Sequence, residues 1–127
     1  MSQRTALRGG SVAALLLALA LALAACAGAP PVAPSGTPAV TVQLAADDLE
    51  FDRDRLSVPA GVPFAIAFEN RESPPHNVTI RGEQPLFVGE TFSGPDQRTY
   101  LVPSLPAGEY VFLCDVHPEM RGTVVSQ

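Results

Sequence analysis

The sequence predicts an all-β domain, an antiparallel β-sandwich of seven to eight short strands. Prolines recur along the chain after residue 26 and interrupt every stretch that would need a 3.6-residue hydrophobic period to form a helix. Between them, short segments rich in Val, Ile, Phe and Tyr alternate apolar and polar residues, with Pro/Gly turns in between. No internal repeat is visible, so a single domain accounts for the pattern.

The individual strands follow from this alternation. Residues 40–44 alternate, and residues 55–58 alternate before a Pro-Ala-Gly turn. In the next segment, 63–69, every second residue is large and apolar, which places three side chains on one face. The same pattern predicts strands over 76–80, 86–88, 90–92, 98–102, 109–114 and 122–126. The hydrophobic core is expected to contain Phe64, Ile66, Phe68, Phe92, Leu101 and Phe112.

The first 25 residues are predicted to be an export signal. Arg4 and Arg8 precede an apolar run over 11–25, which is shorter than the roughly 20 residues that a transmembrane helix needs. The run ends in Leu-Ala-Ala-Cys26, which resembles the lipobox of bacterial lipoproteins, where cleavage exposes a cysteine that carries a lipid. We therefore expect removal of residues 1–25 and lipidation of Cys26. An ordinary signal peptide cut nearby, or an uncleaved anchor, is the alternative.

The chain after the leader is acidic. Residues 26–39, rich in Pro, Ala and Gly, are expected to form a spacer, and the folded domain is expected to span 40–127. Without the leader, six arginines face thirteen acidic residues, a net charge of −7. This charge argues against nucleic acid as a partner and makes membrane attachment depend on the lipid. The acids between Asp47 and Asp54 form either a solvated edge, which we favour, or a surface that steers a basic partner.

A short segment near the C-terminus gathers residues that bind metals. In the strand that ends at Cys114, alternation puts Tyr110, Phe112 and the cysteine on one face. His117 follows the cysteine by three residues, and Met120 follows by three more. A loop of this kind can bring a thiol, an imidazole and a thioether to one point.

These residue types suit copper. A thiolate, two imidazoles and a weak axial thioether form the ligand set of a blue copper site. The second imidazole can only be His76, at a predicted loop-to-strand transition, because the chain has two histidines. Singly, each residue is more often structural, but together His76, Cys114, His117 and Met120 favour a single copper ion. Zinc would accept the cysteine and histidines but not the thioether, and a binuclear copper centre would need a second cysteine in the loop.

The same residues resemble those of the cupredoxins, the blue copper proteins that include plastocyanin, azurin and amicyanin. The Cys-x2-His-x2-Met spacing is most similar to that of amicyanin, and His76 with Asn77 resembles the first-histidine site of the family. The Gly-x-Tyr-x-Phe-x-Cys pattern that ends at Cys114 resembles the ligand strand of the family; its other members are Gly108, Tyr110 and Phe112. The likeness covers residues 40–127.

The resemblance implies a Greek-key sandwich that holds one type 1 copper ion. The two histidines would bind through Nδ1, Cys114 through its thiolate and Met120 as a weak axial ligand. Asn77 would tie the two ligand segments together and donate a hydrogen bond near the sulfur. Tyr110 would form the tyrosine corner of the sandwich.

The resemblance also places the docking site for redox partners at the exposed edge of His117. That edge would be ringed by Pro75, Pro118 and either Pro85 or Leu86. One residue departs from the family pattern, because Asp115 follows the cysteine where Ser or Thr is usual. A carboxylate beside the thiolate could lower the reduction potential, or it could face solvent and matter little. We favour the second interpretation, because alternation turns Asp115 away from the face of the cysteine.

The functional expectation is an electron carrier rather than an enzyme. We expect a monomer, tethered by its lipid to the outer side of a bacterial membrane, in the periplasm or at the cell surface, that shuttles single electrons between protein partners. The alternative is a protein that buffers or delivers copper, although the domain has no surplus of Met, Cys or His beyond one ligand set. A catalytic site of its own would need further histidines, and none remain.

Overall fold

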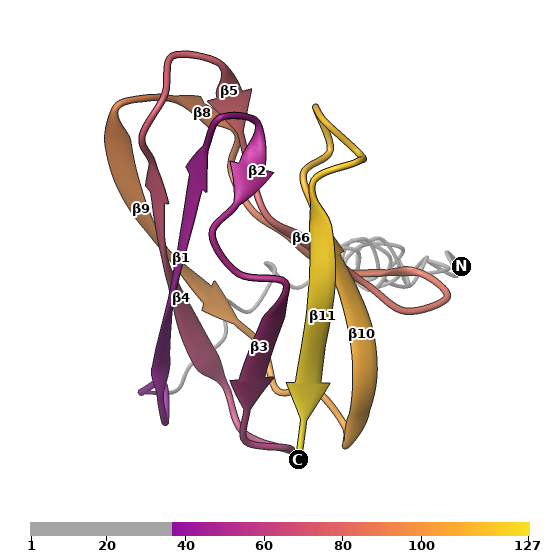
Figure 1. The fold of residues 1–127 in the computed structure, drawn as a ribbon. Coiled ribbons are helices and arrows are strands. Elements are labelled where there is room, and N and C mark those ends of the chain that lie inside the picture. Colours follow the sequence, from indigo (N-terminus) through magenta and orange to yellow (C-terminus); the bar gives the residue numbers. More distant parts are fainter. Residues whose placement is uncertain (1–36) are drawn as a thin grey trace, which may run out of the picture. The chain divides into compact units, whose positions relative to one another are not determined.

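Two β-sheets pack face to face in the computed structural model, which describes residues 37–127 (Figure 1). One sheet has the strand order β2-β1-β4-β9, the other β3-β11-β10-β6-β7, and a short pair, β5-β8, lies at one end. The strands are β1 (Thr41–Asp47), β2 (Glu50–Phe51), β3 (Arg55–Val58), β4 (Phe64–Asn70), β5 (Pro75–His76), β6 (Thr79–Arg81), β7 (Pro85–Val88), β8 (Phe92–Ser93), β9 (Asp96–Val102), β10 (Gly108–Leu113) and β11 (Arg121–Ser126). None of the described residues is helical, and the predicted all-β sandwich is confirmed.

Two strand pairs run parallel, so the sheets are mixed rather than antiparallel throughout. β1 lies parallel to β4, with Thr41 opposite Ala65, and β3 lies parallel to β11, with Arg55 opposite Thr123. Parallel neighbours need a crossover between them. The chain supplies one by visiting the second sheet, at β3, on its way from β1 to β4. Alternation of apolar residues indicates that a segment forms a strand but not which strand it pairs with.

Side chains from both sheets fill the core between them. Five of the six predicted core residues are buried: Phe64, Ile66, Phe68, Phe92 and Phe112. The prediction for Leu101 is wrong, because this side chain is 49% exposed. Strand β9 turns Tyr100 and Val102 inward instead, which is the opposite choice of face on an alternating strand.

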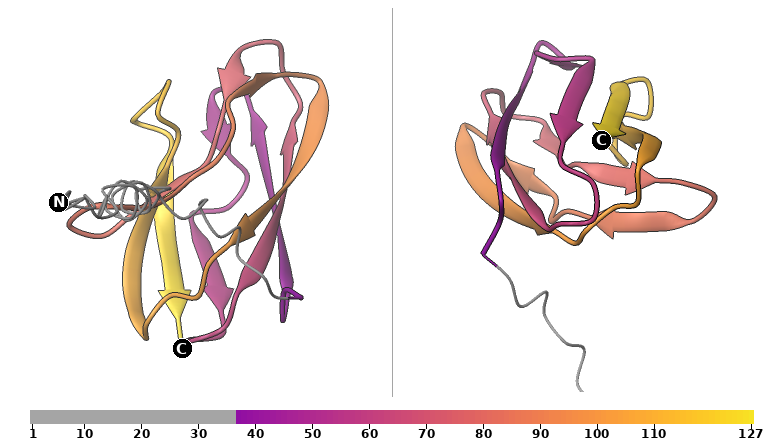
Figure 2. Two further views of the ribbon diagram at one scale, coloured as in Figure 1. Left: turned by 180° about the vertical axis from the view of Figure 1, so that it is seen from behind. Right: turned by 90° about the horizontal axis from the view of Figure 1, so that it is seen from below.

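The segment predicted as one strand over 76–80 forms two strands in separate sheets. In β5, His76 lies opposite Phe92 of β8, whereas β6 pairs with β10 and β7. Asn77 and Val78 lie in the break and are buried. The β1–β2 hairpin, which was not predicted, and the connection between β10 and β11 reach the same end of the sandwich (Figures 1 and 2). Segments far apart in sequence therefore meet at this end.

The pairing of β10 with β11 sets the position of the connection between them. The hydroxyl of Tyr110 donates to the carbonyl of Pro106 at 2.9 Å, the contact expected of a tyrosine corner. Gly122 lies opposite Phe112, and a Cβ atom on Gly122 would overlap both the Phe112 ring and the carbonyl oxygen of Asp54. Glycine is therefore required here for close packing, directly after the loop that carries Cys114.

The leader over 1–25, the lipidation of Cys26 and most of the spacer over 26–39 lie outside the described residues. Within residues 37–127, no helix has the length and apolar character needed to cross a membrane. The first strand begins at Thr41.

Candidate metal centre

The connection between β10 and β11 holds three of the four predicted ligands and is closed by its own hydrogen bonds. The N–H of Cys114 donates to the carbonyl of Met120 at 3.0 Å, and the N–H of Met120 donates to the carbonyl of His117 at 2.9 Å. The guanidinium of Arg121 donates twice to the carbonyl of Pro118, at 2.9 and 2.6 Å. The loop that carries the thiol and one imidazole is thus held in one conformation.

The other imidazole, that of His76, comes from β5 and is fully buried. Its Nε2 atom lies 2.9 Å from Oε1 of Glu72, so the Nε2–H group donates to the carboxylate. The same oxygen accepts the N–H of Leu49 at 2.9 Å. With a proton fixed on Nε2, the Nδ1 atom keeps a free lone pair for a metal.

Asn70 shapes the turn that leads to His76. This side chain is fully buried, and its Nδ2 atom donates to the carbonyls of Pro74 and Phe92, at 2.9 and 3.1 Å. Its Oδ1 atom accepts the N–H of Glu72 at 3.0 Å. One asparagine therefore positions both the histidine-bearing turn and the carboxylate that orients the imidazole.

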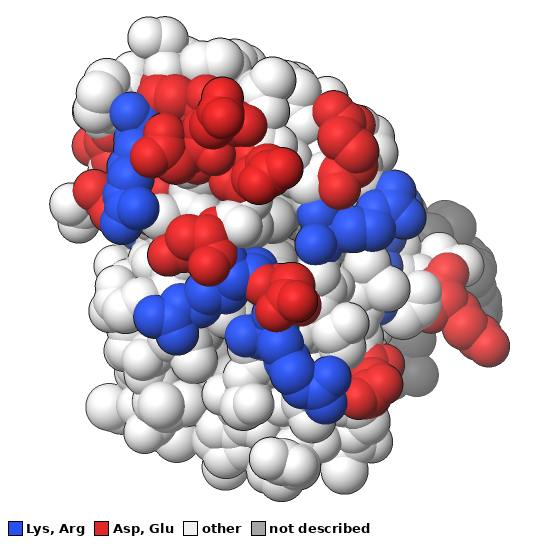
Figure 3. All heavy atoms as spheres, viewed as in Figure 1, with Lys and Arg blue, Asp and Glu red and all other residues white. Residues whose placement is uncertain are grey.

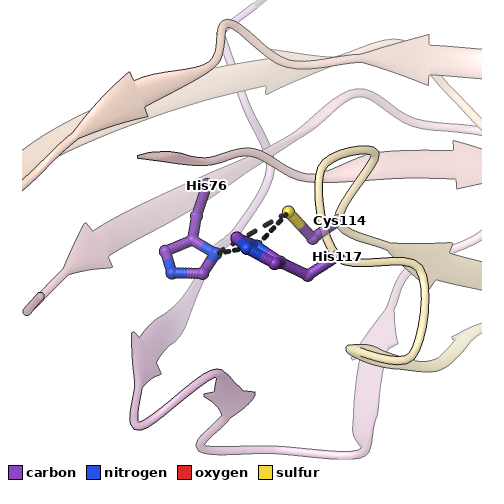
Figure 4. Close-up of side chains that lie close together, drawn as sticks. All are labelled: His76, Cys114 and His117. Atoms are coloured by element: carbon purple, nitrogen blue, oxygen red, sulfur yellow. Dashed lines mark hydrogen bonds between the residues drawn. The ribbon is translucent and has the colours of Figure 1, made fainter. Parts of the chain in front are cut away.

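Three ligand atoms converge between this turn and the loop (Figure 4). The Nδ1 atoms of His76 and His117 lie 3.2 Å apart, and they lie 3.7 and 3.9 Å from the Sγ atom of Cys114. Metal bonds of about 2.0–2.3 Å put two ligands of one ion about 3.3–3.8 Å apart. The observed separations are close to this range, so the side chains fit a single ion as they stand. A thiolate with two imidazoles is the equatorial ligand set of a blue copper site.

Met120 belongs to the same buried cluster as Cys114. Its side chain is 3% exposed, and its backbone carbonyl accepts the N–H of Cys114, so the two buried residues are neighbours across the loop. A buried thioether at this position suits a weak ligand that completes a copper site. It also fills the core, as a methionine without a metal would.

His117 differs from His76 in its exposure. It is half-buried, whereas His76 and Cys114 are fully buried. Pro75 and Pro118, each next to a histidine in sequence, are exposed. The cluster is thus open to the surface on the side of His117.

Strand β7 carries Pro85 and Leu86, the two residues of which one was expected beside His117. Strand β7 pairs with β6 so that Pro85 lies opposite Arg81, toward the turn of the hairpin, while Val88 lies opposite Thr79. Val88, which is 60% exposed, is therefore the β7 residue nearer to the cluster. Pro85 and Leu86 lie farther along the hairpin.

Asn77 connects the two ligand segments, since it follows His76 and bonds to the residue after Cys114. Its Oδ1 atom accepts the N–H of Asp115 at 2.8 Å. Its Nδ2 atom donates to the carboxylate of Asp115 at 3.0 Å and to the carbonyl of Gly89 at 3.1 Å. The hydrogen bond from Asn77 was expected near the sulfur of Cys114. The two protons on Nδ2 point instead to the Asp115 carboxylate and to the Gly89 carbonyl.

Asp115 is exposed, as expected, but its carboxylate also makes hydrogen bonds, which were not expected. It accepts hydrogen bonds from Asn77, from the hydroxyl of Thr79 and, at 3.1 Å, from the guanidinium of Arg81. Burial acts to raise the pKa of Asp115. The hydrogen bonds from Thr79, Asn77 and Arg81 outweigh burial and hold this pKa below its usual range. The side chain of Asp115 is therefore an ionised, hydrogen-bonded carboxylate in the residue next to Cys114.

Several residues that hold the cluster in place were not predicted from the sequence. They are Asn70, Glu72, Thr79, Arg81 and Arg121. Thr79 and Arg81 act through hydrogen bonds to Asp115, which is distant in sequence, whereas the others bond to residues of their own turn or loop, and no motif marks any of them.

Acidic side chains gather over the end of the sandwich that carries the cluster (Figure 3). Asp47, Asp48 and Glu50 are exposed in the β1–β2 hairpin. A groove between this hairpin and the ligand loop is lined by Leu49, Glu50, Phe51, Glu119, Met120 and Arg121. A partner that approaches the ligand loop from this side meets a negative surface.

Comparison with known proteins gives a consistent result. Residues 13–126 match the cupredoxin-like domain family. Amicyanin of Paracoccus versutus is 30% identical over 99 residues, which cover 75% of this chain and 71% of that protein.

Solved structures agree with this match. Dithionite-reduced auracyanin of the photosynthetic bacterium Roseiflexus castenholzii superposes with a TM-score of 0.63 at 20% identity, covering 72% of this chain and 99% of that chain. Auracyanin A of Chloroflexus aurantiacus, described as a "blue" copper protein, superposes with a TM-score of 0.61 at 19% identity, covering 68% and 98%. At these identities the likeness establishes the fold.

Proposed function

The chain belongs to the cupredoxin-like family, and from this premise we propose that it binds one type 1 copper ion and passes single electrons between protein partners. Cupredoxins of this kind are blue copper electron-transfer proteins rather than enzymes. The proposed ligands are His76, Cys114, His117 and Met120. The observation that carries the proposal is the convergence of two Nδ1 atoms and one thiol sulfur, all within 4.8 Å of one another.

The proposed ligands have unequal roles. The Cys114 thiolate is a soft donor that suits Cu(I), and the two imidazoles bind both oxidation states. Met120 would tune the site as a weak axial donor. When bound, the copper supplies a reversible one-electron couple. The hydrogen bonds of the loop and of Glu72 hold the donors in place in either state, which keeps the rearrangement that accompanies electron transfer small.

The proposed electron route passes through His117. Its half-buried ring is the one ligand side chain among the three converging residues with access to the surface. A redox protein that docks over Pro75 and Pro118 would reach the edge of this ring. The acidic hairpin beside the ligand loop supports a partner with a basic docking face.

We place the protein outside the cytoplasm, as a monomer tethered by lipid on Cys26. This part of the proposal rests on the sequence: two arginines, an apolar run and a cysteine after Leu-Ala-Ala. Mass spectrometry of the protein from membranes tests it. We expect an N-terminal Cys26 that carries acyl chains, and an intact, unmodified Met1 would overturn this placement.

Copper buffering or delivery is less well supported by the site. A protein that hands over its metal needs ligands that a recipient can reach. His76 and Cys114 are fully buried, and Met120 is nearly so. Slow release of copper to a weak chelator is therefore expected.

Copper titration of the purified domain tests the proposal. One equivalent of Cu(II) should bind and produce the intense visible charge-transfer band of a copper–thiolate bond, and the band should vanish and return on reduction and oxidation. The Cys114→Ser variant should lose the band. A Glu119→Gln variant, altered at an exposed position of the same loop, should keep it. A colourless copper complex of the unaltered protein would contradict the proposal.

A further inference from the structure

We propose that Asp115 is a positioning residue whose carboxylate adds Thr79 and Arg81 to the link that Asn77 makes, so that all three clamp the loop of Cys114 to the segment of His76. We also propose that its negative charge lowers the reduction potential of the site. The effect on the potential rests on the proposed copper site. The clamp itself is a property of the folded chain and can be tested without metal.

The clamp consists of bonds to both ends of the aspartate. Its backbone N–H donates to the side-chain oxygen of Asn77 at 2.8 Å, and Asn77 donates back to the carboxylate at 3.0 Å. The hydroxyl of Thr79 donates to the same carboxylate oxygen, and the guanidinium of Arg81 donates to the other oxygen at 3.1 Å. One carboxylate thus collects donors from three residues of the segment that follows His76.

The position of these residues in the chain makes the contact significant for the cluster. Asp115 directly follows Cys114, and Asn77 directly follows His76, so the clamp joins the immediate neighbours of two proposed ligands. Asn77 is 1% exposed and Thr79 is fully buried. Their donors have no access to water, and loss of the shared acceptor would leave them unsatisfied, at a cost of about 1–3 kcal/mol per group.

A serine or threonine after the cysteine could accept a bond from Asn77 but could not replace the carboxylate. A hydroxyl has one oxygen atom and no charge, whereas Asp115 uses both oxygens and pairs with Arg81. The carboxylate also sits one residue from the thiolate. A nearby anion stabilises the more positive, oxidised metal, which lowers the reduction potential.

Three variants separate the clamp from general effects of charge. Asp115→Asn removes the charge and one acceptor oxygen. Arg81→Gln removes an exposed donor to Asp115 and leaves the buried hydrogen bonds intact. The clamp can therefore be tested with this variant if Asp115→Asn fails to fold. The matched control is Glu109→Gln, which removes an acid from an Arg–acid pair, Arg55–Glu109 at 3.0 Å, at the other end of β10.

The first measurement uses copper-free protein. In Asp115→Asn the N–H groups of residues 77–79 and 115 should exchange with solvent at least several-fold faster than in the unaltered protein. Arg81→Gln should show a smaller change at the same sites, and Glu109→Gln should show none there. If Asp115→Asn and Glu109→Gln show the same exchange at these residues, the clamp is refuted, whatever the chain binds.

The second measurement uses copper-loaded protein. The reduction potential should rise in Asp115→Asn and, since the carboxylate stays, should fall or stay constant in Arg81→Gln. Release of copper to a chelator should be roughly tenfold faster or more in Asp115→Asn. An unchanged potential with altered exchange would retain the clamp and refute the electrostatic part. Failure of the unaltered protein to form a copper–thiolate band would refute the proposed function and leave the exchange result valid.

Discussion

The Nε2 atom of His76 lies 2.9 Å from Oε1 of Glu72, and the same oxygen accepts the N–H of Leu49 at the tip of the β1–β2 hairpin. The buried imidazole is thus connected to the surface of the acidic hairpin through a single carboxylate. A carboxylate on the far nitrogen of a metal-binding histidine fixes the ring and strengthens its donor atom. The acceptor of the Nε2–H bond is Glu72 and not a strand residue around His76. A substitution of Glu72 therefore tests its role.

We predict that Glu72→Gln weakens copper binding by about 10–100-fold and raises the reduction potential, because an amide oxygen accepts the hydrogen bond without the negative charge. Competition with a chelator measures the copper affinity, and voltammetry measures the reduction potential. Glu69→Gln is the control, since Glu69 lies nearby in β4 and pairs with Arg71 instead. Equal effects of the two substitutions would show that only charge, and not the contact with His76, matters.

Substitution of Met120 should separate its roles in packing and in tuning. Met120→Leu conserves volume, so the copper-free protein should lose less than about 1.5 kcal/mol of stability, while Met120→Ala should lose about 2–5 kcal/mol. In both variants the copper–thiolate band should persist with an altered reduction potential, since the thioether is a weak ligand. Chemical denaturation and voltammetry provide the measurements. Loss of the band in the leucine variant would mean that the thioether is an essential ligand.

Gly122→Ala should destabilise the domain by about 1–3 kcal/mol, because the added methyl group would overlap the Phe112 ring and the Asp54 carbonyl. The control is Gly82→Ala, where the nearest atom to a new Cβ, on Leu86, is at an ordinary distance of 3.5 Å. Urea denaturation of the two variants tests the difference. Equal stabilities would show that β10 and β11 can move apart at no cost.

Tyr100 should make stability depend on pH in the alkaline range. Burial raises the pKa of its phenol, with a further contribution from the Glu90 carboxylate, and the hydroxyl donates to the Glu90 carbonyl at 2.6 Å. The unfolded chain therefore loses this proton at lower pH than the folded one. The stabilising contribution is complete below the ordinary phenol pKa of about 10 and is lost as pH rises above it. The free energy of unfolding should decrease from about pH 8 to about pH 11, and this decrease should be larger in the unaltered protein than in Tyr100→Phe. Equal slopes would contradict this account.

The sequence was sufficient to predict the sandwich and the local part of the site. Short alternating segments between prolines indicate strands, and β3 was predicted with its observed bounds, 55–58. The spacing of Cys114, His117 and Met120 is local, so one loop suffices to bring them together. Few histidines in the chain made His76 the remaining candidate.

Only the tertiary structure decided the rest, because strand pairing and hydrogen bonds between distant segments have no local signature. The two parallel pairs and the inward face of β9, which exposes Leu101, depend on which strands become neighbours. The bond between Asn77 and Asp115 joins two segments that are 38 residues apart in sequence. Glu72 and His76 lie in one turn, but the conformation of that turn depends on the contacts of Glu72 with Leu49 and of Asn70 with Phe92. The residue types of the candidate site were therefore visible in the sequence, whereas the bonds that hold them in place arise only when the two sheets come together.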